Sequence, residues 1–368
     1  MEKGMITARQ FGILVALAVI GDSLLIMPGF LASIAHHDAW LSALIGIPLG
    51  VLVMLLFCLA AKCYPKLNLI ESLQKVYGNW IGALLSLLFL YHSLMNSGAI
   101  LREAGDFIIT HSLPQTPMAA VMLLFAVIIA MAIKLRLEAF TRTAELLIVV
   151  FVLFFIFFCA ALLPQIKLSE LQPVYSNGFV PIARGALVSF TFSFVEVGAF
   201  LMITPYVSWN GKGSMRKQFV SGAIIGGVVL LIVTLLTITV LGTHLTERQM
   251  YPTYTLAKKI SIGNFLERLE AILAIMWIIT NYFKIVVHAY ALSAGLAHLL
   301  RLKDYRELAV PVTLLVVATA MIISPNIVFF NTVLTKNWPL FDIVFSLGVP
   351  VMLIVGYAVR KGVGSIGK

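Results

Sequence analysis

The chain has 368 residues and a mass of 40.3 kDa; 61% of the residues are apolar, 11% are charged and the mean hydropathy is +1.01. A soluble globular domain usually carries about 25% charged residues, so the composition excludes a soluble protein and indicates a chain that lies in a lipid bilayer. The net charge of +10 could indicate nucleic-acid binding. The basic residues lie in loops between apolar runs, however, and the membrane topology of the chain is the better explanation of this distribution. We therefore expect no nucleic-acid partner.

Ten apolar runs follow one another along the chain, each suited to a membrane-spanning helix. They lie at 8–31, 39–61, 80–110, 117–134, 142–163, 182–207, 218–241, 268–298, 308–324 and 338–359. With a cytoplasmic N-terminus, 17 lysines and arginines fall in loops on the cytoplasmic side and seven on the other. The positive-inside rule then predicts that both termini are cytoplasmic. We expect an all-α polytopic membrane protein in which residues 1–368 form a single transmembrane permease-like domain.

Two of these runs carry an acid near their middle. Asp22 in the first run and Glu196 in the sixth lie 174 residues apart, and each has an adjacent or nearby glycine and a proline downstream. The same shift carries the start of the first run to the start of the sixth. A unit of five helices is odd-numbered, so the second copy enters the membrane from the other side. The sequence predicts a five-plus-five inverted repeat, with copies at about 8–163 and 182–359.

Inverted repeats of this kind build a midplane site in many transporters from interrupted helices. We expect interruptions of the first and sixth helices near Gly21 and Gly198, because glycine tolerates backbone conformations that other residues avoid. The alternative for each glycine is that it only permits close helix packing.

The third and eighth runs carry further polar residues. Tyr91 and Met95 lie one turn apart in the third run, and Thr280, Lys284 and His288 form a stripe in the eighth. An ammonium group near the bilayer centre is costly and normally faces a carboxylate or a cavity. We expect Lys284 to pair with Glu196 or Asp22, and the alternative is a purely structural ion pair. Arg102 and Asp106 form an i,i+4 pair that a structural role would also explain.

The loop 242–267 is long for a connection between helices. Its apolar spacing after Pro252 predicts a short helix on the outer side of the bundle. This segment is either a lid over the site or a packed connector.

Signatures of enzymes and metal sites are missing from the sequence. It contains no Walker motif, dinucleotide-binding turn, zinc-binding helix or nucleophile elbow. Its three cysteines give neither a disulfide framework nor a zinc spacing, and the adjacent His36, His37 and Asp38 lack further ligands nearby. We expect no enzymatic activity, no catalytic residues, no cofactor and no metal.

Several segments of the chain stand out as motifs: Tyr251-Pro252-Thr253-Tyr254, Ile260-Ser261-Ile262-Gly263-Asn264-Phe265-Leu266-Glu267-Arg268-Leu269-Glu270, Trp277, Ile6-Thr7-Ala8-Arg9-Gln10 and Phe194-Val195-Glu196. They resemble the motifs of the bacterial spore germination permease family, in the amino acid-polyamine-organocation superfamily. The resemblance extends over the length and the ten-helix layout. It implies the B subunit of a nutrient germinant receptor in the endospore inner membrane, with A and C subunits as partners and a small germinant such as an amino acid as ligand.

The resemblance also implies a ligand site where the broken first and sixth helices meet the third and eighth. Carried over to this sequence, the site residues are Gly21, Asp22, Ser23, Tyr91, Met95, Phe194, Glu196, Thr280 and Lys284. One departure matters, because the usual small-residue stretch of the first helix contains an acid here. An acid at that point argues against a ligand carboxylate held by backbone alone, and favours a ligand ammonium or neutralisation by Lys284.

Two other functions compete with that of a sensor. A proton-coupled amino acid permease would use Asp22 or Glu196 as its titrating group. An ion or water conduit, opened on germination, would be lined by the polar stripes of the third and eighth helices.

Overall fold

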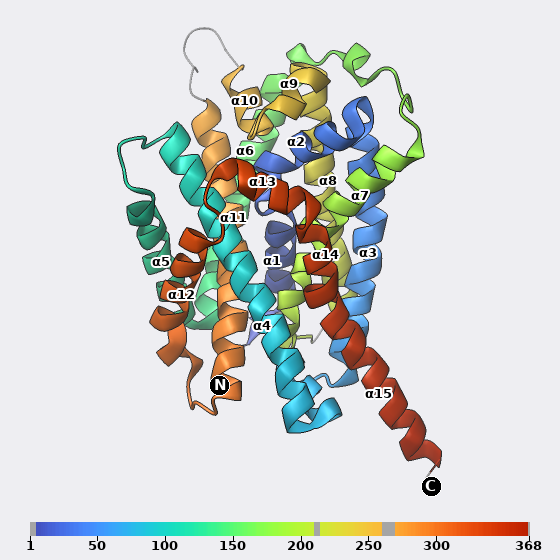
Figure 1. Ribbon diagram of the computed structural model, residues 1–368, viewed down its shortest axis with the longest axis vertical. Coiled ribbons are helices and arrows are strands. Elements are labelled where there is room, and N and C mark those ends of the chain that lie inside the picture. The colour runs from blue at the N-terminus through green and yellow to red at the C-terminus, as the bar shows by residue number, and fades with distance from the viewer. Residues whose placement is uncertain (1–4, 210–213, 260–268, 367–368) are drawn as a thin grey trace.

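The computed structural model describes residues 5–209, 214–259 and 269–366 and consists almost entirely of helices (Figure 1). In the first half the α-helices are α1 (Ala8–Ile20), α2 (Ser23–Ala35), α3 (Ala39–Cys63), α4 (Leu69–His111), α5 (Met118–Lys134) and α6 (Arg136–Leu162). In the second half they are α7 (Phe179–Phe194), α8 (Met215–Leu241), α9 (Thr243–Arg248), α10 (Pro252–Lys258), α11 (Leu269–Leu299), α12 (Ala309–Ile322), α13 (Ile327–Lys336), α14 (Trp338–Asp342) and α15 (Gly348–Ile366). Short 3-10 helices lie at His36–Asp38, Leu163–Gln165, Leu168–Leu171, Val195–Met202, Thr204–Tyr206 and Tyr305–Leu308, and a π-helical turn lies at Ile343–Leu347.

The long helices run side by side along the long axis of the molecule, and both chain ends lie at the same end (Figure 1). Eight helical segments of the described chain are long and apolar enough to cross a membrane, and one of them joins α2 to α3. The shorter apolar helices include α1 and α5. When α1 and α2 are taken together as one interrupted span, the arrangement matches the ten-helix layout predicted from the sequence.

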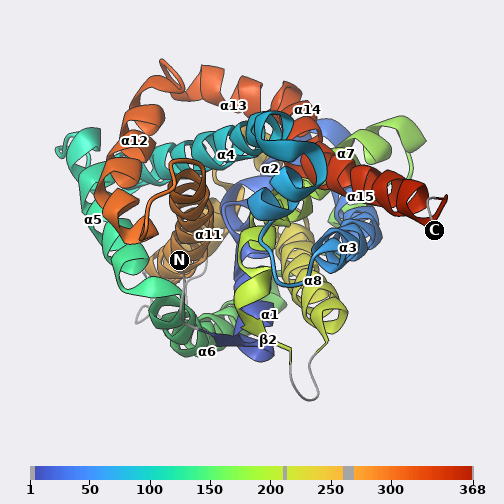
Figure 2. The same ribbon diagram turned by 90° about the horizontal axis from the view of Figure 1, so that it is seen from below.

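Helix α1 lies inside the bundle, whereas α5, α12 and α13 lie at its edge (Figure 2). Almost every residue of α1 is buried, including those on opposite faces. A helix that is apolar all round lies either in a packed core or against lipid, and the burial of α1 shows that neighbouring elements cover it. The first span is therefore the central element on which the site is built.

The first span is interrupted at Gly21, as predicted. Helix α1 ends at Ile20, Gly21 has φ 34° and ψ −134°, and α2 begins at Ser23. A positive φ favours glycine. A Cβ at this position would lie 2.6 Å from Cδ of Lys284, so the site leaves no room for a side chain.

The sixth span is also interrupted, but four residues earlier than Gly198. Helix α7 ends at Phe194, and the chain continues as a 3-10 helix over Val195–Met202. At Gly198 a Cβ would lie 2.6 Å from the Ser346 hydroxyl oxygen. Close packing is therefore the role of Gly198, which was the alternative interpretation.

Two further boundaries agree with the sequence prediction to within a few residues. Asn68 and Glu71 form a capping box at the start of a short helical stretch, but Gly78, with φ 78° and ψ −179°, is not helical, so the spanning part of α4 begins close to the predicted start near 80. The tenth span runs from Trp338 to Gly362 through α14, the π-helical turn and α15, as the predicted start at 338 requires. Helix α13, in the connection before this span, was not predicted.

The predicted helix after Pro252 is present as α10, which packs against the bundle. Tyr251 and Tyr254 place their rings 5.1 and 5.0 Å from Phe107 of α4, and Phe107 contacts Trp277 of α11 at 4.9 Å. These rings are buried. They cover the end of the α4–α11 interface that lies away from the chain termini. The motif block 260–268 lies outside the described residues.

The N-terminal segment is anchored by short-range hydrogen bonds. Thr7 caps α1 in a capping box with Gln10, whose side-chain amide also donates to Glu145 of α6 over 2.9 Å. Strand β1 (Ile6–Thr7) pairs in parallel with β2 (Val207–Ser208), which follows the sixth span. The family-like residues at positions 6–10 thus join three segments of the chain.

Candidate functional site

The break in the first span frees backbone carbonyls that α11 satisfies. The Thr280 hydroxyl donates to the carbonyl of Gly21 over 2.9 Å, and the indole N–H of Trp277 donates to the carbonyl of Asp22 over 3.1 Å. All of these groups are buried. An unpaired buried carbonyl would be costly in a membrane, so the polar stripe of α11 makes the break tolerable.

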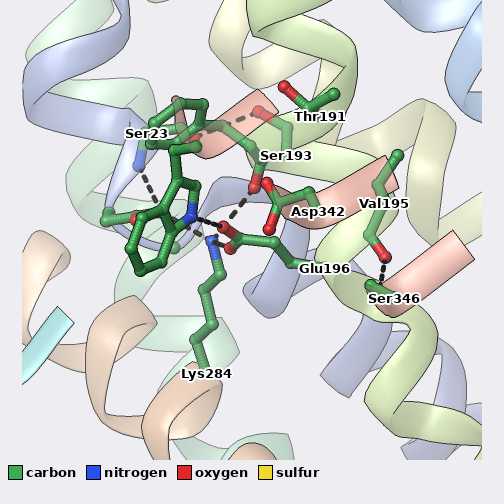
Figure 3. A network of polar contacts seen from close by, with 12 residues as sticks. Ser23, Thr191, Ser193, Val195, Glu196, Lys284, Asp342 and Ser346 are labelled. Atoms are coloured by element: carbon green, nitrogen blue, oxygen red, sulfur yellow. Dashed lines mark hydrogen bonds and ion pairs between the residues drawn. The ribbon is translucent and has the colours of Figure 1, made fainter. Parts of the chain in front are cut away.

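Lys284 lies at the centre of the site and bridges the two acids of the repeat, and Figure 3 shows its ammonium group directed toward Glu196. Its ammonium nitrogen lies 2.7 Å from the Asp22 carboxylate and also forms an ion pair with the carboxylate of Glu196. It donates a further hydrogen bond to the carbonyl of Phe192 over 3.1 Å. The expected pairing of Lys284 is therefore found with both acids at once.

Asp22 also caps the second half of the broken span. Its carboxylate accepts a hydrogen bond of 2.9 Å from the amide of Ser23, at the start of α2. The N-terminus of a helix favours negative charge. The Ser23 hydroxyl lies 3.1 Å from that of Ser193 on α7, which links the two interrupted spans directly.

The tenth span contributes side chains that the sequence analysis missed. The indole N–H of Trp338 donates to Glu196 over 3.1 Å, and the Ser346 hydroxyl donates to the carbonyl of Val195 over 2.7 Å (Figure 3). The carboxylate of Asp342 lies 2.8 Å from Nε2 of His92. The π-helical turn carries Ser346, and such turns are frequent at functional sites.

A signal for Asp342 does exist in the sequence. It lies among Leu340, Phe341, Ile343 and Val344, and an ionisable residue within an apolar run marks a functional site by default. The prediction was limited to acids near the middle of a run, and Asp342 lies near the start of one. His92 appears in the polar face of the third run, but no sequence spacing connects it to a residue 250 positions away.

The site contains more acidic than basic side chains. Asp22 and Glu196 share the single ammonium of Lys284, and Asp342 is completely buried with a histidine as its partner. In α4, Arg102 bonds Asp106 over 2.8 Å and also donates to the carbonyl of Ser324. That i,i+4 pair lies at the α4–α12 contact, which agrees with a structural role.

The structure brings six of the predicted site residues together. They are Gly21, Asp22, Ser23, Glu196, Thr280 and Lys284. Among the described residues, no side-chain hydrogen bond or ion pair joins the other three, Tyr91, Met95 and Phe194, to this cluster.

Tyr91 is 49% exposed and its ring packs edge-on against Phe341 and Phe345, so it lies on the outer face of α4. Met95 is half-buried among apolar side chains. Phe194 is buried in a slot between α3 and α8, where a Cβ at Gly50 would lie 2.2 Å from its ring and one at Gly227 3.1 Å. Its direction around the helix could not be judged without the positions of those glycines.

The histidines of the predicted non-metal cluster near residue 36 hold loops together. His36 pairs with Glu247 at 3.1 Å, His37 lies 3.0 Å from the hydroxyl of Thr243, and the buried Asp38 accepts a hydrogen bond from the amide of Tyr175. Within the described ranges, no group of three histidines, cysteines or acids is placed to hold a metal ion.

Comparison with solved structures agrees with this architecture. The crystal structure of MhsT in complex with L-phenylalanine superposes with a TM-score of 0.64 at 15% identity, covering 99% of this chain and 91% of that one. A manganese transporter of Eremococcus coleocola superposes with a TM-score of 0.63 at 12% identity, covering 93% of this chain and 79% of the other. At such low identities the likeness shows the fold, which is that of transporters with a five-plus-five inverted repeat.

Sequence relatives carry the family assignment. Spore germination protein KB of Bacillus subtilis (strain 168) is 28% identical over 329 residues, which are 89% of this chain and 87% of the relative. Spore germination protein XB of Bacillus anthracis is 24% identical, covering 74% of this chain and 76% of the relative. The sequence profile described as "Spore germination protein" matches residues 5–332. This chain therefore belongs to the spore germination protein family.

Proposed function

We propose that the chain is the membrane subunit of a spore germinant receptor that binds a small nutrient germinant, of the amino acid class, at the broken-helix site. The observation that carries the proposal is the contact of Lys284 with both Asp22 and Glu196. These three residues belong to the first, sixth and eighth spans, so a ligand that enters among them acts on three elements at once. We further propose the endospore inner membrane as location, cytoplasmic termini and a single permease-like domain.

The charges at the site suit a zwitterion. The pair formed by Lys284 and Asp22 presents an ammonium and a carboxylate, the two groups that a free amino acid also carries. A ligand carboxylate would compete with Asp22 for the amide of Ser23, and a ligand ammonium would compete with Lys284 for Glu196. The internal pair thus occupies, in the absence of ligand, the hydrogen-bonding positions that an amino acid would take.

Replacement of the contact between Lys284 and Asp22 by a ligand would change the packing of helices around the site, and this change is the proposed signal. Thr280 and Trp277, on the same helix as Lys284, bond the carbonyls of Gly21 and Asp22. A shift of α11 that accompanies displacement of the Lys284 side chain therefore weakens the contact between α11 and the break. A ligand shifts such an equilibrium only by its differential affinity for the two states. The A and C subunits of the receptor are the proposed readers of that shift.

The proposal is tested by binding measurements on the purified full-length chain against amino acids, sugars and nucleosides. We expect thermal stabilisation by at least one amino acid, and loss of that response in Glu196→Ala and Thr280→Ala. Glu307→Gln is the matched control, because Glu307 is an exposed acid in the short 3-10 helix before α12. Responses that survive both site substitutions would place the ligand elsewhere.

A proton-coupled permease is the second candidate. It is favoured by the transporter fold and by the buried acids, of which Asp342 adds a third beside Glu196 (Figure 3). Uptake of labelled amino acid into liposomes distinguishes the two functions, since a pure sensor binds without accumulating its ligand. Ligand-dependent ion flux in vesicles with all receptor subunits would instead support a conduit.

A further inference from the structure

A groove lies on the flank of the molecule, in the half opposite both chain ends, where α2, α7, α13 and α14 meet (Figure 1). Its volume is about 540 Å³. The residues that matter for its chemistry are Ser33 and Ile34 from α2, Arg184 and Leu187 from α7, and Thr335 and Lys336 from α13. The groove is distinct from the ion-pair cluster, none of whose residues lines it.

Two cations face this groove without a counter-charge. Arg184 and Lys336 are both exposed, and no residue that lines the groove is acidic. In the described part of the chain neither side chain forms an ion pair. They come from helices far apart in the sequence, so the fold brings them to one place. An anion between them would therefore meet two positive charges and no repulsion.

The surface around the groove is that of a membrane protein at the edge of the bilayer. Leu187 is 44% exposed, Leu340 67% and Val328 72%. Helix α13 runs across the long helices (Figure 1) and buries Phe330 while exposing Phe329. A short amphipathic helix of this kind lies in the interface plane, where phosphate groups and the first carbons of acyl chains are found.

We propose that the groove binds an anionic phospholipid. The phosphate lies between the guanidinium of Arg184 and the ammonium of Lys336, within reach of the hydroxyl of Thr335, and an acyl chain follows Leu187 and Ile34. Arginine is suited to phosphate because its planar group presents several donors in a fixed arrangement. Basic pockets between membrane helices are suited to anionic headgroups for the same electrostatic reason.

The lipid would act on the elements that build the ion-pair cluster. Arg184 lies on α7, which leads directly into Glu196, and Lys336 is two residues before Trp338. Glu196 and Trp338 are joined by a hydrogen bond of 3.1 Å. A headgroup bound by both cations therefore connects α7 with the α13–α14 segment at the surface of the protein, as the hydrogen bond does in its interior. Binding of the lipid does not depend on the identity of the ligand at the cluster.

The test uses the purified full-length chain in mild detergent and native mass spectrometry with phosphatidylglycerol and phosphatidylcholine of equal chain length. We expect a roughly thirtyfold preference for phosphatidylglycerol, the size that two interfacial cations provide. Arg184→Gln/Lys336→Gln should lose this preference. The matched control Lys167→Gln/Arg248→Gln, which removes two other exposed cations, should keep it.

A second variant tests the same groove independently, in case the first variant does not fold. Ser33→Trp fills the groove without changing the charge and should also reduce phosphatidylglycerol binding at least several-fold. A wild-type chain without preference for phosphatidylglycerol, or a preference retained in both groove variants, would overturn the proposal. Inorganic phosphate that displaces the lipid at equal concentration would assign the site to soluble anions and overturn it as well.

Discussion

Lys284 forms ion pairs with carboxylates from both halves of the repeat through a single ammonium group. Its side chain is 2% exposed, as is that of Glu196. Removing one partner of a buried pair leaves an uncompensated charge, which is far more costly than removing all partners together. The contribution of this residue is therefore best measured by substitutions that keep or break the charge balance.

We predict that Lys284→Met destabilises the chain by about 3–5 kcal/mol, because Asp22 and Glu196 lose their counter-charge. Thermal unfolding in detergent measures the loss. The control is the triple variant Asp22→Asn/Glu196→Gln/Lys284→Met, which should recover most of the stability. Normal stability and a full ligand response in Lys284→Met would contradict both the structural and the functional role of the ion pair.

Gly21 should tolerate no side chain. Its φ is positive, and an added Cβ would lie only 2.6 Å from Cδ of Lys284, so we predict a cost of about 1–3 kcal/mol for Gly21→Ala. Thermal unfolding and the amount of folded protein in membranes check this. Gly362→Ala is the matched control, since Gly362 lies in helix α15 with open space around its Cα. Equal stability of the two variants would argue against strain at the break.

At the scale of elements, α10 is held by aromatic packing. The rings of Tyr254 and Phe107 lie 5.0 Å apart, and the ammonium of Lys258 lies 4.7 Å from the centre of the Tyr254 ring. Large buried rings contribute both apolar area and a preferred edge-on geometry. A helix of seven residues has little stability of its own. Its fold therefore depends on these contacts.

We predict that Tyr254→Ala releases α10 and speeds tryptic cleavage after the exposed Lys258 and Lys259 several-fold. Limited proteolysis followed by mass spectrometry measures the rate. Tyr175→Ala provides the control, because Tyr175 is 57% exposed in a loop. A cleavage rate that stays at the wild-type value would show that α10 does not rely on the Tyr254 ring.

Much of the element order could be predicted from the sequence, because apolar runs in a membrane protein report spans directly. The separate helix α13 could not, since its 10 residues are too few for a span and include several polar side chains. The exact break of the sixth span could not either, because Phe194 and Val195 lie within a single apolar run. Hydropathy measures where a chain is apolar, and it carries no information on where an apolar chain bends.

Three ionisable residues of the site could be predicted, because charged side chains are rare within apolar runs. Asp22, Glu196 and Lys284 were found because burial of a charge demands a partner. The positions of Tyr91 and Phe194 could not be predicted in this way, since an aromatic side chain is stable in contact with lipid, in a packed core or in a ligand pocket. Only the neighbours decide, and for Phe194 those neighbours are two glycines on other helices.

At the scale of the whole molecule, the inverted repeat explains how acids 174 residues apart meet at one lysine. Each half contributes one interrupted span, and α11 closes the site between them. The basic residues of the loops predict that both chain ends face the cytoplasm. The structure places these two ends at the same end of the bundle (Figure 1), as that orientation requires.

Orientation is tested with single cysteines in a chain whose Cys58, Cys63 and Cys159 are replaced by alanine. We predict that Ser169→Cys reacts with a membrane-impermeant maleimide from outside intact cells. Lys361→Cys should react only after the membrane is permeabilised. Labelling in the reverse pattern would contradict the predicted topology.

The pairing of β1 with β2 constrains how the molecule can open. Ile6 pairs with Val207 and Thr7 with Ser208, so the beginning of the first span and the end of the sixth are tied at the end of the bundle that holds both termini. Neither segment can swing outward alone without breaking this pairing. As long as the pairing holds, the beginning of the first span and the end of the sixth move together in any opening on that side.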